Sequence, residues 1–104
     1  MTGSQSPFAN VLHVETIAKL ARASAMERGR AYVDRVSDLE RRDARLSAFV
    51  RGSRSRPYVI SIWVKGNGIG YVCSCPAGAE GEFCKHLVAV ALVWVERVER
   101  SRRR

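Results

Sequence analysis

The sequence CSCPAGAEGEFCKH, residues 73–86, contains all three cysteines of the chain and one of its two histidines. Three thiolates and one imidazole make a complete tetrahedral ligand set for zinc. A chain of 104 residues has a small core, and such domains are often completed by a metal ion or by disulfides. Because three cysteines cannot all pair and Cys73 and Cys75 are one residue apart, we predict metal binding rather than disulfides.

The spacing of the four residues makes geometric demands on the chain. Cys73 and Cys75 must converge on a metal at about 2.3 Å, so the chain must leave its strand near Cys73 and bend, with Pro76 and Gly78 placed for the turn. Two residues on a helix differ by about 200°, so Cys84 must precede a helix whose first turn contains His86. The metal then ties the end of a hairpin to the start of the last helix.

Two other interpretations of the cysteines remain open. They are buried or redox-active thiols without metal, or Cys84 and His86 form a nucleophilic pair, although no third orienting group is evident. Catalytic zinc keeps one position free for water, whereas these four ligands fill all four. Glu80 and Glu82 are then loop charges rather than acids or bases. We predict one structural zinc ion, bound by Cys73, Cys75, Cys84 and His86, and no enzymatic activity.

Residues 73–86 resemble the SWIM zinc finger, whose pattern is Cys-x-Cys, a variable spacer and Cys-x-His. The match includes Pro76 after the second cysteine and the run Phe83–Leu87 that enters an apolar helix. SWIM domains often carry a helix, a β-meander and an Arg-Gly-x-x-Tyr-like stretch, which here corresponds to Arg28–Tyr32. The resemblance implies DNA binding or protein–protein interaction, in company with a helicase, recombinase or other DNA-processing protein.

The region before the cysteines begins with a polar segment, Met1–Asn10, that we expect to be a loose tail. From Val11 to about Asp34 the spacing of apolar residues predicts helix, in two pieces. Ser24 and Glu27 fit a capping box that would start the second piece. Gly29 weakens that helix.

Alternating side chains then predict a β region. Val36–Arg41 is a first strand, after which the chain turns at Arg42-Asp43. In residues 45–51, Leu46, Ala48 and Val50 alternate with Arg45, Ser47, Phe49 and Arg51, which predicts a half-buried second strand. Residues 52–57 are a polar turn before a strand from Tyr58 to Val64. Gly66-Asn67-Gly68 favours a tight hairpin, after which residues 69–72 return as a fourth strand.

The last element, Leu87 to about Arg100, is rich in valine but long and free of turn residues, which favours a helix packed across the sheet. The predicted fold is therefore α+β, with an N-terminal helical region, a four-stranded antiparallel β-meander, a zinc knuckle and a C-terminal helix. We expect one domain over residues 11–100, between the tail of residues 1–10 and a basic tail of residues 101–104.

The charge of the chain points to a polyanionic partner. The formal net charge is +8, which suits nucleic acid first and an acidic protein surface second, although it also serves solubility. Trp63 either stacks on a base or packs under the N-terminal helix. The candidate nucleic-acid-binding residues are Arg51, Arg54, Arg56, Lys85, Arg102, Arg103 and Arg104.

The alternative is a protein-interaction adaptor with a purely structural zinc site. Its surface would be any part of the apolar face of Leu87–Val98 that the sheet leaves uncovered. The polar start of the chain lacks the apolar stretch of a secretory signal, and the longest apolar run is about half of the ~18 residues of a membrane span. We expect a cytoplasmic protein, nucleoid-associated if bacterial, with no membrane partner and no small-molecule substrate.

Overall fold

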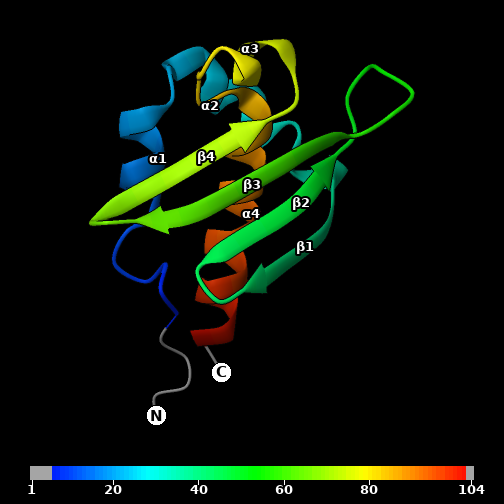
Figure 1. Ribbon diagram of the computed structural model, residues 1–104. Helices are drawn as coiled ribbons and strands as arrows, with labels where there is room; N and C mark the ends of the chain where they lie inside the picture. The colour runs from blue at the N-terminus through cyan, green and yellow to red at the C-terminus, as the bar shows by residue number, and fades with distance from the viewer. Residues whose placement is uncertain (1–5, 103–104) are drawn as a thin grey trace.

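The computed structural model describes residues 6–102 (Figure 1). It confirms the predicted α+β fold of N-terminal helices, a four-stranded meander and a C-terminal helix. The elements in chain order are α1 (Val14–Leu20), α2 (Ala23–Arg30), a 3-10 turn η1 (Val33–Arg35), β1 (Val36–Arg42), β2 (Arg45–Val50), β3 (Tyr58–Lys65), β4 (Gly68–Cys73), α3 (Pro76–Ala79) and α4 (Lys85–Arg102).

The four strands pair in chain order, each antiparallel to the next. In β2, Leu46, Ala48 and Val50 are buried while the residues between them are exposed, as the alternation predicts. Gly66 has a positive φ of 59° in the turn between β3 and β4, a conformation that glycine adopts at little cost. Sheet order and facing were therefore predictable from side-chain alternation and one glycine turn.

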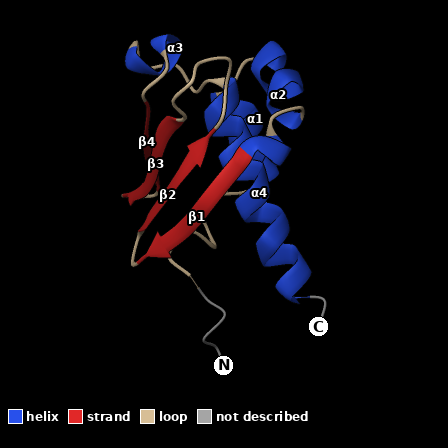
Figure 2. Ribbon diagram, turned by 90° about the vertical axis from the view of Figure 1, so that its right-hand side faces the viewer, coloured by secondary structure: helices blue, strands red, loops and turns tan. Residues whose placement is uncertain are grey.

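Helices α1, α2 and α4 lie on one face of the sheet, so the molecule has two layers, and α3 lies at the end of β4 (Figure 2). Helix α4 is the centre of the helical layer and packs against α2, α1 and the sheet. Residues 87–91 of α4 are fully buried. This confirms a helix rather than a strand, and it places the first part of the apolar face of Leu87–Val98 in the core, while Leu92, Val93, Val95 and Val98 are partly buried.

Helix α2 starts differently from the prediction. Its N-cap is Arg22, no side chain caps it, and Ser24 is already the second residue of the helix, so the capping box is wrong. Gly29 is buried where α2 crosses α4, and a Cβ at this position would lie 2.6 Å from Val88 Cβ. The glycine therefore permits the close approach of the two helices, which a helix-propensity argument misses.

The N-terminal segment is part of the core over the residues that the structure describes. Phe8 is 1% exposed and packs edge-to-face on Trp94 of α4, with 6.0 Å between ring centroids. The chain turns here, since the amides of Val11 and Leu12 both donate to the Phe8 carbonyl. The prediction of a loose tail through Asn10 is thus wrong for the part that starts at Ser6. Residues 1–5 lie outside the described residues.

The pairing of the first two strands is irregular. It has a bulge between Ser37 and Glu40, where Asp38 has a φ of 56°, and the sequence did not indicate this bulge. Across the bulge, Arg97 of α4 donates a 3.3 Å hydrogen bond to the Leu39 carbonyl.

Within residues 6–102, no helix is both long enough and apolar enough to cross a membrane.

Candidate metal centre

The four predicted ligands come from three places that the fold brings together. Cys73 ends β4, Cys75 is the N-cap of α3, Cys84 directly precedes α4, and His86 is the second residue of α4. The Cys84 carbonyl accepts the Val88 amide at 3.0 Å, which is the first bond of the helix. His86 therefore lies in the first turn, as the spacing predicts.

The Cys-x-Cys pair lies where the chain leaves β4 and bends at Ser74 and Cys75. Ser74 still pairs with β3, because its amide donates to the Val59 carbonyl at 3.1 Å and its hydroxyl accepts the Val59 amide at 2.9 Å. Pro76 then starts α3, which contains Gly78. The chain therefore leaves its strand at Cys73 and bends, as the spacing predicts.

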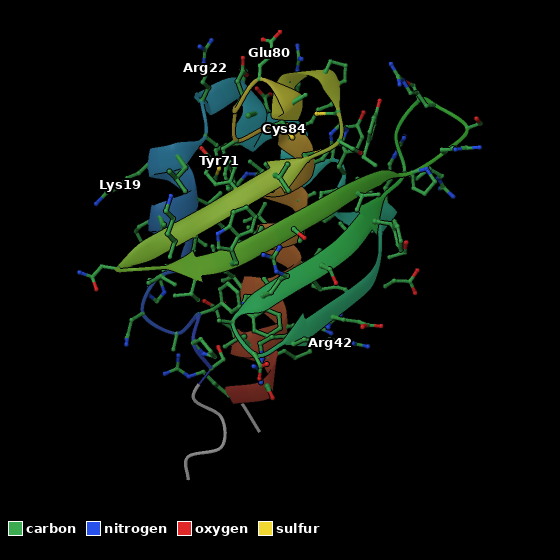
Figure 3. All side chains as sticks on the ribbon, in the orientation of Figure 1. Lys19, Arg22, Arg42, Tyr71, Glu80 and Cys84 are labelled. Atoms are coloured by element: carbon green, nitrogen blue, oxygen red, sulfur yellow. The ribbon has the colours of Figure 1, made fainter. Side chains whose placement is uncertain are left out.

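Gly78 allows α3 to fold back onto the end of β4. A Cβ here would lie 2.6 Å from both the Cβ and the carbonyl oxygen of Cys73. The Gly78 amide donates to Cys75 Sγ at 3.2 Å, which ties the α3 turn to this ligand. The rest of the loop is held by Tyr71, whose ring meets buried Phe83 edge-on at 4.8 Å (Tyr71 is labelled in Figure 3).

The distances between the ligand atoms fit one tetrahedral zinc ion. All four side chains are buried, and their ligand atoms lie within 4.8 Å of one another. His86 Nδ1 is 3.8 Å from Sγ of both Cys73 and Cys84. Zinc bonds of about 2.3 Å to sulfur and about 2.0 Å to nitrogen require ligand atoms roughly 3.5–3.8 Å apart. The site is thus a buried Cys3His centre suited to a single structural Zn²⁺, with Nδ1 as the imidazole ligand.

The protonation of the thiols follows from their mutual contacts. The hydrogen bond from Cys73 lowers the pKa of Cys84 to about 4, and the same bond together with burial raises the pKa of Cys73. The two thiols therefore share a proton in the absence of metal. Zinc requires thiolates, so metal binding displaces that proton.

Two tyrosines hold the imidazole of His86 in place. The Tyr58 ring lies 4.5 Å from it at a tilt of 34°, and the Tyr32 ring meets it edge-on at 5.2 Å. Sequence reasoning did not identify either residue as part of the site. Tyr32 does belong to the Arg28–Tyr32 stretch that carried part of the resemblance, and its contact with a ligand gives that stretch a physical role.

The other charged residues near the motif are arranged around this centre. The Nζ of Lys85 lies 5.0 Å over the ring of Tyr32, which also contacts His86. Glu80 and Glu82 are exposed on the loop, and Glu80 points outward, away from Cys84 (Figure 3). These placements agree with glutamates that are loop charges.

The candidate basic residues separate into two groups. Arg51, Arg54 and Arg56 lie on the exposed loop between β2 and β3, and the Arg51 amide donates to the Arg35 carbonyl near Tyr32 and Lys85. Arg102 is exposed at the other end of α4, about 26 Å from Lys85 by helix rise. Arg103 and Arg104 lie outside the described residues. The structure therefore places Lys85 and the Arg51 end of the loop near Tyr32, and it separates Lys85 from Arg102.

Comparison with known proteins agrees with the geometry. The family model of the SWIM zinc finger matches residues 58–94, from the start of β3 through Trp94 of α4, a span that contains all four ligands. No curated protein and no solved structure matches the chain. Given this match and the buried Cys3His cluster, residues 58–94 of this protein are a SWIM zinc finger.

Proposed function

We propose that this zinc-binding SWIM module binds nucleic acid, DNA in the first place, through a basic surface at its zinc end, as part of a DNA-processing system. The observation that carries the proposal is the gathering of cations around Tyr32. The guanidinium of Arg35 and the ammonium of Lys85 each lie 5.0 Å from the ring centroid, and Arg51 is hydrogen-bonded to Arg35 through the backbone.

The loop arginines extend this surface. Arg51, Arg54 and Arg56 are exposed, and within residues 6–102 none of them forms an ion pair. Cations without acidic partners are free to contact phosphates. Each such contact releases counterions from the nucleic acid. We call Arg35, Arg51, Arg54, Arg56 and Lys85 the basic end.

The metal would act on this surface only by shaping it. The four protein ligands complete a tetrahedral zinc, so no position is left for a reacting water. Zinc would hold the start of α4, and therefore Lys85, against the end of β4. We propose accordingly that the module is a binding domain and not an enzyme.

The test is fluorescence anisotropy of the zinc-loaded protein with labelled DNA and RNA, titrated across salt. We expect binding whose logarithmic salt slope becomes shallower by roughly 0.7–0.9 for each phosphate contact removed. Arg54→Gln with Arg56→Gln should weaken binding to all sequences. Arg100→Gln is the control, because Arg100 is exposed on α4 and paired with Glu96 at 3.3 Å. Absence of binding at low salt would contradict the proposal.

A second candidate is the protein-interaction adaptor. The face of α4 that suggested it is buried, but a different apolar surface is available. Val59, Val72 and Phe49 are 53%, 47% and 39% exposed on the sheet. Binding that resists salt and depends on these residues, rather than on the basic end, would favour the adaptor.

A further inference from the structure

We propose that the open face of the sheet is a platform for single-stranded nucleic acid; this inference rests on the proposed function and specifies its ligand. The surface consists of the side chains that point away from the helical layer. We call it the outer face; it comprises Ser37, Glu40, Arg42, Arg45, Ser47, Phe49, Val59, Ser61, Trp63, Lys65 and Val72.

No described element covers the outer face. Helices α1, α2 and α4 lie behind the sheet, α3 lies beyond the end of β4, and the four strands are open on the other side (Figures 1 and 2). Phe49 and Val59 are directly paired across β2 and β3, and Val72 pairs with Ser61 one strand further on. Because these pairs are neighbours in the register, the exposed apolar side chains form one strip rather than scattered residues.

One end of the strip carries a guanidinium held in a fixed position. Arg45 pairs with Trp63 across the strands, and its Cζ lies 4.7 Å over the indole. The indole in turn lies across Gly70 of β4, so closely that a Cβ there would clash with it. Trp63 therefore neither packs under the N-terminal helix nor presents a free ring to a base. Stacking leaves the N–H edge of Arg45 to bind a phosphate with little further loss of side-chain freedom.

The charges match a polyanion that crosses the strip. Arg42, Arg45 and Lys65 lie at one end of the strands, where Figure 3 labels Arg42, and the loop arginines lie at the other end. Glu40 is the acidic residue that the register places on this face, and it is 3.8 Å from Arg42. Arg45 and Phe49 are four residues apart, about 13 Å along β2. Cations thus flank the apolar strip, as required for phosphates on either side of bases.

Single strands fit this arrangement better than a duplex does. A duplex presents phosphates but keeps the faces of its bases stacked inside, so the exposed Phe49 ring would find no partner. Unpaired bases expose flat apolar faces that stack on aromatic side chains with little sequence preference. The strip gives such bases a surface, whereas the basic end alone would accept either form of nucleic acid.

The experiment compares a labelled oligothymidine with a duplex of the same length, both bound to the zinc-loaded protein. Phe49→Thr removes the ring but suits a strand, and Arg45→Gln removes the stacked guanidinium. Val14→Thr, 41% exposed on α1, is the control for the first, and Arg100→Gln for the second. Zinc content and thermal unfolding establish that every variant is folded.

We expect the wild type to bind the single strand more tightly than the duplex. Phe49→Thr should weaken single-strand binding roughly 5- to 150-fold with an unchanged salt slope, the loss typical of one stacked base. Arg45→Gln should weaken it and make the slope shallower by about 0.7. The two control variants should bind like the wild type.

Three results would overturn the inference. Equal binding of single strand and duplex would remove the role of the bases. Wild-type affinity in both Phe49→Thr and Arg45→Gln, with loss in Arg54→Gln and Arg56→Gln, would confine binding to the basic end and leave the proposed function standing. No binding of any nucleic acid, with capture of an acidic peptide that depends on Phe49, would overturn both proposals and assign the outer face to a protein partner.

Discussion

His86 is positioned by aromatic contacts as well as by the helix that carries it. Replacing Tyr58 by Thr removes the ring that lies 4.5 Å from the imidazole, and we expect zinc affinity to fall on the order of tenfold because the ligand is less well oriented. Tyr58→Phe keeps the ring and should bind zinc like the wild type. Competition with a chromophoric chelator measures both; equal loss in the two variants would show that the hydroxyl, and not the ring, matters.

Gly29 gives a prediction in which two effects have opposite signs. Helix propensity alone favours alanine here by about 0.5–1 kcal/mol. The Cβ would however press on Val88, which is fully buried in α4, and overpacking costs about 1–3 kcal/mol. We expect Gly29→Ala to destabilise the protein by roughly 1–2 kcal/mol in urea unfolding. A stabilised variant would show that the α2–α4 crossing yields easily.

Ser24→Ala is the companion measurement on the same helix. The residue is exposed and caps nothing, so its replacement should change the free energy of unfolding by no more than about 0.5 kcal/mol. A capping box would make the same change cost about 1 kcal/mol.

Single residues also show what the sequence could and could not indicate about the site. The four ligands were predictable because their chemistry and spacing lie within residues 73–86. Tyr32 and Tyr58 were not, because they reach His86 from distant parts of the chain through tertiary packing. Neither contact expected for Trp63 is present, because its pairing with Arg45 depends on the register between two strands.

At the scale of elements, the N-terminal segment is the clearest departure from the sequence-based expectation. Its polar composition indicated a tail, yet Phe8 fills a buried position against Trp94. Phe8→Ala should lower the free energy of unfolding by about 3–5 kcal/mol, as for other buried aromatics. Leu20→Ala, at a residue 39% exposed, is the matched control and should have a small effect. A small effect of Phe8→Ala as well would show that the N-terminal segment is a loose tail.

Helix α4 explains why periodicity was ambiguous. It packs between the sheet and α1 and α2, so residues 87–91 are buried all round and show no polar face. The polar face returns after Trp94, with exposed Glu96, Arg97 and Glu99. Length and the lack of turn residues identified the helix correctly. The bulge of β1 had no sequence signal, because the residue with a positive φ there is Asp38 and not a glycine.

For the whole molecule, the charge is divided between surfaces with different expected roles. The loop of Arg51, Arg54 and Arg56 belongs to the basic end and joins two strands of the outer face, while Arg102 lies at the far end of α4. We expect Arg102→Gln to leave the affinity for DNA unchanged in the anisotropy titration. A loss as large as that of Arg54→Gln with Arg56→Gln would show that nucleic acid extends along the helical layer.

The metal joins the two layers of the fold, since its ligands come from β4, the α3 turn and the start of α4. Structural zinc in small domains contributes on the order of 10–16 kcal/mol, which is comparable to or larger than the whole stability of such a domain. The most direct test is circular dichroism and thermal unfolding of the protein, loaded with a measured amount of zinc, during titration with a chelator. We predict one zinc per chain and loss of the folded spectrum and of the unfolding transition as zinc is removed. A zinc-free protein with an unchanged spectrum and unfolding temperature would contradict this account.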